Sequence, residues 1–334
     1  MKKDSQKLFF GWWTVLITGF LSGLGNSFYI YGMSALFKPI SSELGFSRAA
    51  TSVAAGISRL EGGLDSLMTG WLVDRFGPRW VMAAGLFVMS VGLFIMNLVY
   101  SLWMYCLIWG VIIGIGRNVS LVIAVDKSLT EWFIEKRGMA IGLKFAIMSM
   151  LGVVVLPFLT WLINIYGWRL SCMIWGIITI AGIPLVIIFV RTKRPEFYGL
   201  LPDGANIDQT KYNSQETMVE RGIVYAEGFK EVEFTLRQAM KSPAFWVIIA
   251  VFSCYAIVMA SINIHCIPFL TDMGIDPLFA SGMMGFMIFF MIPSRFLSGY
   301  ISDRVSREHI HFIVSVSFIL TLIAIGALLL RPTD

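Results

Sequence analysis

Ionisable side chains inside long apolar runs carry most of the chemical information in this sequence. Arg117 and Arg295 each lie in an apolar stretch long enough to cross a bilayer, where a charge costs about 2.5–3.5 kcal/mol on insertion scales. A guanidinium group can donate two parallel hydrogen bonds to a carboxylate, so each arginine is a candidate ligand for an organic anion. The structural alternative is an arginine paired with an acid of a neighbouring helix.

A second group of charges, Arg59, Glu61 and Asp65, lies within another apolar run. At 100° per residue Glu61 and Asp65 are about 40° apart on one helix face, so they are neighbours. Two carboxylates this close in a low dielectric can share a proton, as a proton-coupling site requires. The alternative is a packing network with basic residues of other helices, for which Gly62 and Gly63 would permit close approach.

Weaker candidates for solute contact are polar side chains of two further apolar runs. They are Asn26, Tyr29 and Tyr31 in the first run and Tyr255, Asn263 and His265 in a later one. A hydrogen-bonded structural role is the simpler explanation of His265. Lys144 is a further basic candidate, whereas Asp126 and Lys127 lie near a helix end and are expected to cap it or reach the interface.

Several function classes are disfavoured. No nucleophile–base pair, metal-ligand spacing or phosphate-binding loop is present, so we expect neither an enzyme nor a bound cofactor. His309 and His311 would lie on opposite faces of a helix, and the 4 cysteines form no CxxC pair, so no metal site is expected. The net charge of +5 follows membrane topology and does not indicate nucleic-acid binding.

The composition predicts an all-α polytopic membrane protein. The chain is 57% hydrophobic and 14% charged, and a soluble domain of this length could not bury so much apolar surface. About 20 helical residues cross the hydrocarbon core, which gives nine predicted spanning helices. These are 12–37, 49–73, 80–99, 103–130, 138–164, 168–190, 243–271, 277–301 and 309–330.

These spans divide the chain into a six-helix N-terminal half, 1–190, a polar linker, 191–242, and a partial C-terminal half, 243–334. Within the linker, 210–220 is predicted to lack structure, and 234–240 to form a short amphipathic helix at the membrane interface. Most of the 26 basic residues fall in the N-terminus, the linker and the loops on the same side. The positive-inside rule therefore places the N-terminus and the linker in the cytoplasm.

A charged, glycine-bearing segment occurs twice. The first copy, 70–79, reads GWLVDRFGPR, and the second, 299–308, reads GYISDRVSRE; each follows a long apolar run. Such repeats are typical of transporters built from duplicated halves. We call them the first hairpin and the second hairpin.

The first hairpin resembles the helix 2–3 signature of the major facilitator superfamily, G-x-L-x-D-R-x-G-x-R. It carries every fixed residue, whereas the second copy has Ser306 and Glu308 at two of these positions. Further stretches resemble the oxalate/formate antiporter and monocarboxylate transporter branch of that superfamily. Among them are FGWW at 10–13, FKPI at 37–40 closing the first helix, RGMAIG at 137–142, and RPEFYGLLPDG at 194–204.

The resemblance implies a twelve-helix fold, of which this sequence would hold nine, and truncation of a longer chain is the preferred explanation. It implies an arginine facing the central cavity at Arg295, and a gating role for both hairpins. The gating residues would be Gly70, Asp74, Arg75, Gly77, Arg79, Gly299, Asp303 and Arg304. Proton symporters of this branch carry an acid one turn before that arginine, where this chain has Met291. The motifs of drug antiporters in helices four and five are also missing.

The resulting expectation is a monomeric plasma-membrane transporter that moves a small mono- or dicarboxylate by alternating access, coupled to a proton or a counter-anion. Arg295 and Arg117 would bind the substrate, with Asn26, Tyr31, Tyr255 and His265 as polar contacts, and Glu61, Asp65 and Arg59 as coupling residues. The alternatives are a transporter of a neutral or amphipathic solute and a non-transporting, truncated or receptor-like membrane protein.

Overall fold

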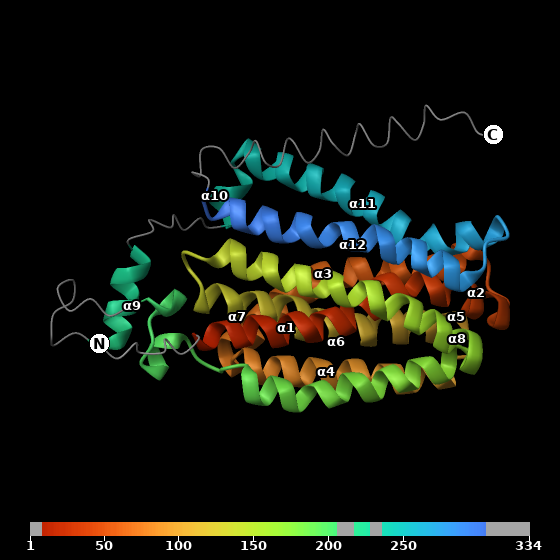
Figure 1. Cartoon of the computed structure of the whole chain (residues 1–334), viewed down its shortest axis with the longest axis horizontal. Coiled ribbons are helices and arrows are strands. Elements are labelled where there is room, and N and C mark those ends of the chain that lie inside the picture. The colour runs from red at the N-terminus through yellow and green to blue at the C-terminus, as the bar shows by residue number, and fades with distance from the viewer. Residues whose placement is uncertain (1–8, 206–216, 228–235, 305–334) are drawn as a thin grey trace, which may run out of the picture.

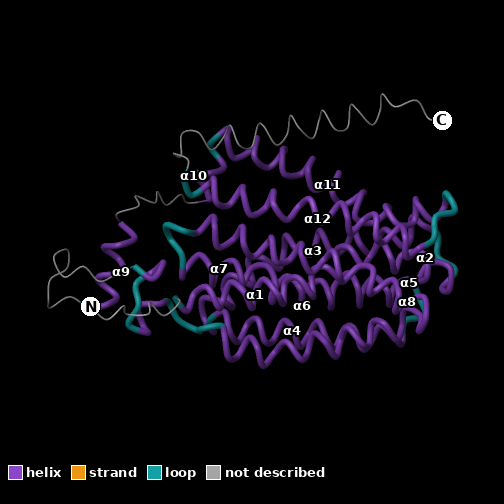
Figure 2. Tube along the Cα trace, viewed as in Figure 1, coloured by secondary structure: helices purple, strands orange, loops and turns teal. Residues whose placement is uncertain are grey.

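The computed structural model describes residues 9–205, 217–227 and 236–304, except the side chains of 54, 55, 58–65, 67, 224, 226, 227 and 236. Every regular element in these ranges is helical (Figure 1). The long helices lie side by side in a bundle, and loops join them at its two ends (Figure 2). We call the end that carries α9, at the left of Figure 1, the linker end and the opposite end the far end.

The first rod of the bundle is longer than predicted. It consists of α1 (Phe10–Asn26), a π-helical segment η1 (Ser27–Tyr31) and α2 (Gly32–Leu44). The prediction that 37–40 closes this helix is wrong, because Pro39 lies inside α2 and the helix continues to Leu44. Gly45 ends it with a φ of 68°, a left-handed conformation that glycine adopts without a steric penalty from a Cβ atom.

The next two helices begin and end at local signals. Ser47 caps α3 (Arg48–Phe76), its Oγ accepting a hydrogen bond from the Ala50 N–H at 3.1 Å, as N-cap serines do. Gly77, with a φ of 79°, ends α3, and Pro78 opens α4 (Pro78–Ile95). Proline suits the first helical position, because its missing N–H would have no intrahelical partner there.

Two further rods complete the first part of the bundle. One consists of α5 (Leu102–Tyr105), η3 (Cys106–Ile113), α6 (Gly114–Asn118), η4 (Val119–Ile123) and α7 (Ala124–Trp132). The other, α8 (Arg137–Phe189), spans 53 residues and contains a non-helical Gly167 with a φ of 78°. A straight helix of that length would extend about 80 Å, whereas α8 turns back at the far end, so it contains two crossings (Figure 1).

The linker is partly ordered. It contains short 3-10 turns η5 (Pro195–Tyr198) and η6 (Pro202–Gly204), then α9 (Met218–Glu227) and α10 (Leu236–Met240). The prediction that 210–220 lacks structure is wrong at its end, where Met218–Glu220 open α9; residues 210–216 lie outside the described ranges. Of the predicted amphipathic helix 234–240, the part that the structure describes is α10.

Two long helices follow the linker, α11 (Pro243–Asp272) and α12 (Pro277–Ser302). Along the bundle α12 packs against α8, and α11 packs against α2 (Figure 1). Much of α11 remains exposed, including Phe252 and Ile257. This apolar exposure suits a helix that faces lipid rather than water.

Five described helical stretches are long and apolar enough to cross a membrane: Pro78–Leu98, Leu102–Trp132, Arg137–Phe189, Pro243–Asp272 and Pro277–Ser302. Apart from the first rod, the described spans begin and end within about three residues of the predicted ones when the 3-10 turn η2 (Met96–Leu98) is counted with α4 and α8 is divided at Gly167. The predicted ninth helix, 309–330, lies outside the described residues, as do Ser306, Glu308, His309 and His311.

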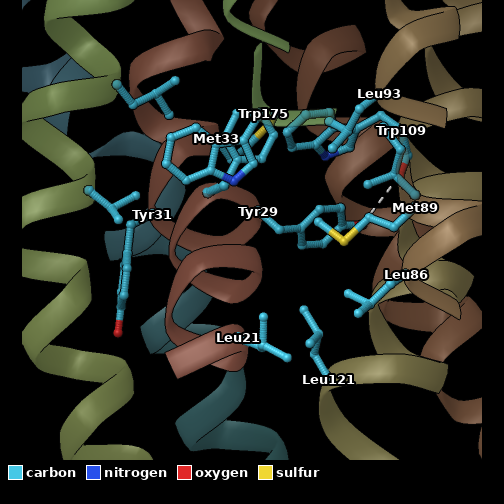
Figure 3. Close-up of a cluster of buried hydrophobic side chains, with 14 of the residues drawn as sticks. Leu21, Tyr29, Tyr31, Met33, Leu86, Met89, Leu93, Trp109, Leu121 and Trp175 are labelled. Carbon is cyan, nitrogen blue, oxygen red and sulfur yellow. Dashed lines mark hydrogen bonds between the residues drawn. The ribbon is translucent and has the colours of Figure 1, made fainter. Parts of the chain in front are cut away.

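Aromatic and aliphatic side chains fill the space around the first rod. Tyr29 packs beside Trp109 and Met89, and Trp175 and Leu93 lie next to this group (Figure 3). Phe28 stacks on Trp175 with ring centroids 5.1 Å apart. This buried cluster holds the first rod against α4, η3 and α8. It therefore fixes the position of the rod's polar residues along the bundle axis.

Candidate functional site

Arg117, on α6, contacts the first rod through Asn26 and Tyr29. Its Nη1 donates to Asn26 Oδ1 at 2.9 Å, and its Nη2 donates to Asn118 Oδ1. The guanidinium carbon lies 4.8 Å from the ring centroid of Tyr29, whose other interactions include a near-parallel stack on Trp109 at 5.1 Å. Amide oxygens and an aromatic face are favourable neighbours for a cation, and these contacts orient the guanidinium group.

Arg295, on α12, points at α8 across the seam between the two helices. Its Nη1 donates to Ser149 Oγ at 2.5 Å and approaches the Phe145 carbonyl oxygen at 3.5 Å. The guanidinium carbon is 5.6 Å from the Phe145 ring centroid. Within the described part of the chain Arg295 has no carboxylate partner, and the groups described around its guanidinium are neutral.

A cavity of about 480 Å³ lies beside Arg295, toward the linker end of the α8–α12 seam. Its lining combines two arginines, one acid and several small residues: Arg137, Gly138, Ile141, Gly142, Phe145, Arg295, Ser298, Gly299, Ser302 and Asp303. The glycines let the two helices approach closely, since a Cβ on Gly142 would lie 2.9 Å from the Arg295 carbonyl oxygen. An arginine without an acidic partner at the wall of a cavity is a physical basis for anion binding.

Lys144 differs from Arg295 because a carboxylate neutralises it. Its side chain is only 2% exposed and forms an ion pair with Asp126 of α7. The sequence analysis did not predict this partner, which the packing of α7 on α8 brings to Asp126, whose side chain is 38% exposed. Two opposite charges on consecutive apolar runs were the signal that could have indicated this pair.

The polar residues expected to contact a solute separate into two groups. Tyr31 and Asn263 are buried; Tyr31 packs near Gly152 and lies apart from the Tyr29–Trp109 pair (Figure 3). Tyr255 is 47% exposed, and His265 is also exposed, with Phe37 edge-on at a ring distance of 5.5 Å. The structure thus places Asn26 with Arg117, and leaves Tyr255 and His265 on an open face of α11.

The expected coupling residues Arg59, Glu61 and Asp65 lie in α3, whose backbone is helical throughout Arg48–Phe76. The spacing of Glu61 and Asp65 therefore does correspond to one helical turn. Their side chains lie outside the described residues, so the coupling role stays a prediction.

The first hairpin makes its described contacts inside the N-terminal part of the bundle. Asp74 forms an ion pair with Lys127 of α7. Arg75 lies over the rings of Trp71 and Phe76 at 5.4 and 5.6 Å, and Arg79 Nε donates to the Val190 carbonyl oxygen at 2.6 Å. The hairpin therefore joins α3 and α4 to α7 and to the end of α8.

The described residues of the second hairpin, 299–304, lie at the end of α12 and contact α8. Asp303 accepts hydrogen bonds from the N–H groups of Gly138 and Met139, both at 2.7 Å, and Arg304 lies 4.1 Å from the Tyr300 ring centroid. These two N–H groups belong to the first turn of α8, where the helix itself offers no acceptor. Asp303 thus caps α8 from another helix.

At the far end a set of charges unused in the sequence analysis joins the two parts of the bundle. Asp272, the last residue of α11, accepts hydrogen bonds from Arg48 at 2.7 and 3.0 Å. Lys38 of α2 also pairs with it, at 2.6 Å. The sequence signal that could have indicated these pairs was Asp272 itself, an acid at the end of the seventh predicted span, on the side of the membrane where basic residues are few.

Long apolar helices that pack side by side, five of the described ones long enough to cross a bilayer, are the architecture of a polytopic membrane protein. The chain belongs to the Major Facilitator Superfamily, whose sequence profile matches residues 15–333. The predicted resemblance to this superfamily is thereby confirmed, and with it the all-helical fold.

Individual relatives are distant. The chain is 23% identical over 320 residues to an uncharacterised transporter of the superfamily from Bacillus subtilis, covering 95% of this chain and 71% of the relative. It is 23% identical over 298 residues to the oxalate:formate antiporter of Oxalobacter formigenes, covering 88% and 62%. It is 21% identical over 294 residues to a membrane sensor protein of Salmonella typhimurium, covering 86% and 63%. The chain thus spans 62–71% of the length of these relatives.

Proposed function

We propose that this protein transports a small organic anion, a mono- or dicarboxylate, across the plasma membrane by alternating access. The observation that carries this proposal is Arg295, a membrane-embedded cation whose described partners are neutral, at the wall of a cavity. A charge in that position is costly unless an anion binds it. A substrate carboxylate could accept the guanidinium N–H groups that Ser149 and Phe145 do not use.

Arg117 is the second positive contact. Its guanidinium is already oriented by Asn26, Asn118 and Tyr29, so an anion binding there would not have to order a flexible side chain. Tyr31, Tyr255 and His265 are assigned as lesser polar contacts. Of these, Tyr31 has the stronger support, because it is buried on the same rod as Asn26.

Coupling is assigned to Glu61 and Asp65, with Arg59 on the same helix. They would bind a proton, or respond to a counter-anion, as the substrate moves. The similarity to an oxalate:formate antiporter supports an anionic substrate and exchange for a second anion. We assign the N-terminus and the linker to the cytoplasm, from the distribution of basic residues, and the working unit to a monomer.

A second candidate is a solute sensor that binds but does not transport. The membrane sensor protein among the relatives supports it. The two candidates differ in one measurable property, because a sensor would bind a carboxylate without moving it across the bilayer.

Uptake of radiolabelled mono- and dicarboxylates into proteoliposomes tests the proposal. We expect Arg295→Ala to reduce uptake roughly 10- to 100-fold, since hydrogen bonds between charged groups contribute about 1.5–3 kcal/mol. Arg295→Lys should retain part of the activity. Arg191→Ala is the control, because Arg191 lies over the rings of Phe10 and Tyr198, away from the cavity lining. Unchanged uptake in Arg295→Ala would refute the role of Arg295, and binding without uptake would favour the sensor.

A further inference from the structure

A carboxylate of the linker holds the loop that precedes α8. Asp203 accepts hydrogen bonds from the N–H groups of Ile134, Glu135 and Lys136, at 3.0, 2.9 and 3.0 Å. The three donors are consecutive and converge on one side chain, which is only 5% exposed. A buried carboxylate with three N–H donors is well solvated by them, and the loop in turn has a defined position.

The backbone at Asp203 is unusual for a residue that is not glycine. Its φ is 60°, the one positive value outside glycine among the described residues, and Gly204 follows with a φ of 66°. The N–H of Ala205 donates to the Pro202 carbonyl oxygen at 3.1 Å and closes the turn. Left-handed backbone costs a residue with a Cβ about 1–2 kcal/mol, although aspartate tolerates it better than most. The bonds to the loop offset this cost.

Tyr225 of α9 completes the arrangement. Its hydroxyl donates to Asp203 Oδ2 at 3.2 Å and lies 3.5 Å from Glu135 Oε2. Burial and the negative charge of Asp203 raise the pKa of Tyr225 above its usual value, so the hydroxyl stays a donor at physiological pH. The linker therefore contacts the loop through two separate elements, the turn at Asp203 and α9.

The same loop leads directly into the contact between α8 and α12. Lys136 is the N-cap residue of α8, and the N–H groups of Gly138 and Met139, within the next three residues, donate to Asp303. Two carboxylates thus hold five N–H groups within a six-residue segment, 134–139. One carboxylate belongs to the linker and the other to α12. Arg137 restrains the segment further by donating from Nε to the Phe133 carbonyl oxygen at 3.3 Å.

We propose that Asp203 is a positioning residue for the α8–α12 contact. By fixing 134–136, it presents the N–H groups of Gly138 and Met139 to Asp303. Movement of the linker away from this loop then weakens the capping of α8 by Asp303 and favours separation of the two helices at the linker end. The linker becomes a part of the gate rather than a passive connection. This inference is independent of the substrate proposed above.

Hydrogen–deuterium exchange of the full chain in lipid nanodiscs tests it without any substrate. The N–H groups at the second and third positions of a helix have no intrahelical acceptor, so protection of Gly138 and Met139 reports the bond to Asp303. In Asp203→Ala we expect faster exchange at 134–136 and, in addition, at least about fivefold faster exchange at 138 and 139, the size of an ordinary coupling between sites. Faster exchange confined to 134–136 would overturn the proposal.

The reciprocal variant, Asp303→Ala, provides a second test of the coupling. Coupling between two sites is mutual, so Asp303→Ala must accelerate exchange at 134–136 as well as at 138 and 139. Tyr225→Phe is the mild variant, because it removes one hydroxyl and leaves the Asp203 carboxylate in place. We expect it to accelerate exchange at 134–136 and at 138 and 139, by less than Asp203→Ala does. Loss of protection along α4 in Asp203→Ala would indicate general loosening of the protein. In that case Asp203→Asn and Tyr225→Phe test the coupling, and unaltered exchange at 138 and 139 in both would refute it.

Discussion

The two copies of the charged hairpin place equivalent aspartates in different physical roles. Asp74 forms an ion pair with Lys127, and 69% of its side chain is exposed. Asp303 instead accepts two N–H groups of α8 at 2.7 Å. The first contact joins helices of the N-terminal part, whereas the second joins α12 to α8. A repeated sequence signature therefore conserves residue types at corresponding positions without dictating what each carboxylate binds.

The glycines that open the two hairpins differ in the same way. A Cβ added to Gly299 would collide with the Gly138 carbonyl oxygen and lie 2.9 Å from Gly142 Cα, whereas one added to Gly70 would meet nothing within 4 Å. At Gly299 the glycine is needed for helix–helix approach. At Gly70 the described surroundings leave room for a side chain.

Substitution of these glycines should give the largest difference between the hairpins. We expect Gly299→Leu to push α12 away from α8 and to lower stability by about 1–3 kcal/mol or more, as overpacked sites do. Gly70→Leu should be neutral or slightly stabilising, because leucine favours helix over glycine by nearly 1 kcal/mol. Thermal unfolding in detergent, followed by tryptophan fluorescence, measures both. Equal losses in the two variants would contradict the comparison.

The aspartates should give a smaller difference. Asp303→Ala removes two charge-assisted hydrogen bonds, each of which contributes about 1.5–3 kcal/mol to stability. It also leaves two N–H groups of α8 without an acceptor. Asp74→Ala removes a largely exposed ion pair, for which about 0–1 kcal/mol is usual. We expect faster thiol labelling of an introduced Ser302→Cys in the Asp303→Ala background, because the α8–α12 seam opens. The same reporter with Asp74→Ala should label at the original rate, and faster labelling there would show that the first hairpin also controls this seam.

The helices could be predicted from the sequence because their causes are local. Apolar runs of bilayer length, the Gly77-Pro78 junction and the Ser47 cap act within a few neighbouring residues. The partners of charged residues could not be predicted, because they depend on which helices pack together. Asp126 with Lys144, and Asp272 with Lys38, are pairs of this kind.

The candidate site shows the same limit. Arg295 and Arg117 could be selected from the sequence, since a cation in an apolar run is conspicuous in any packing. The contacts of Asp203 could not be predicted, because the resemblance of 194–204 to a family stretch does not indicate which N–H groups its carboxylate binds. The start of α9 was missed for a different reason. Its signal, Thr217 followed three residues later by Glu220, is local, but it lies in a stretch whose composition favours disorder.

The smallest expected effect concerns that start of α9, where a carboxylate binds a backbone N–H group within one segment. Glu220 accepts hydrogen bonds from the N–H and the hydroxyl of Thr217, at 2.7 and 3.0 Å, and these bonds hold the pKa of Glu220 below its usual 4.5. A lowered folded-state pKa means that this stabilisation is present above pH 4.5 and is lost as the pH falls below it. We expect the protection of α9 amides from hydrogen exchange, corrected for intrinsic rates, to decrease as the pH falls from 6 to 3.5. In Glu220→Gln the protection should be low at both pH values.

The Glu220→Gln variant also serves as a control for the exchange measurements on the second hairpin. Because the Thr217–Glu220 contact is confined to one turn, Glu220→Gln at pH 6 should leave exchange at Gly138 and Met139 unchanged. Asp303→Ala should change exchange there at the same pH, since its contact joins two helices. If Glu220→Gln altered the amides of α8 as strongly as Asp303→Ala does, exchange at that site would report general loosening of the linker end, and the distinct role of the second hairpin would not hold.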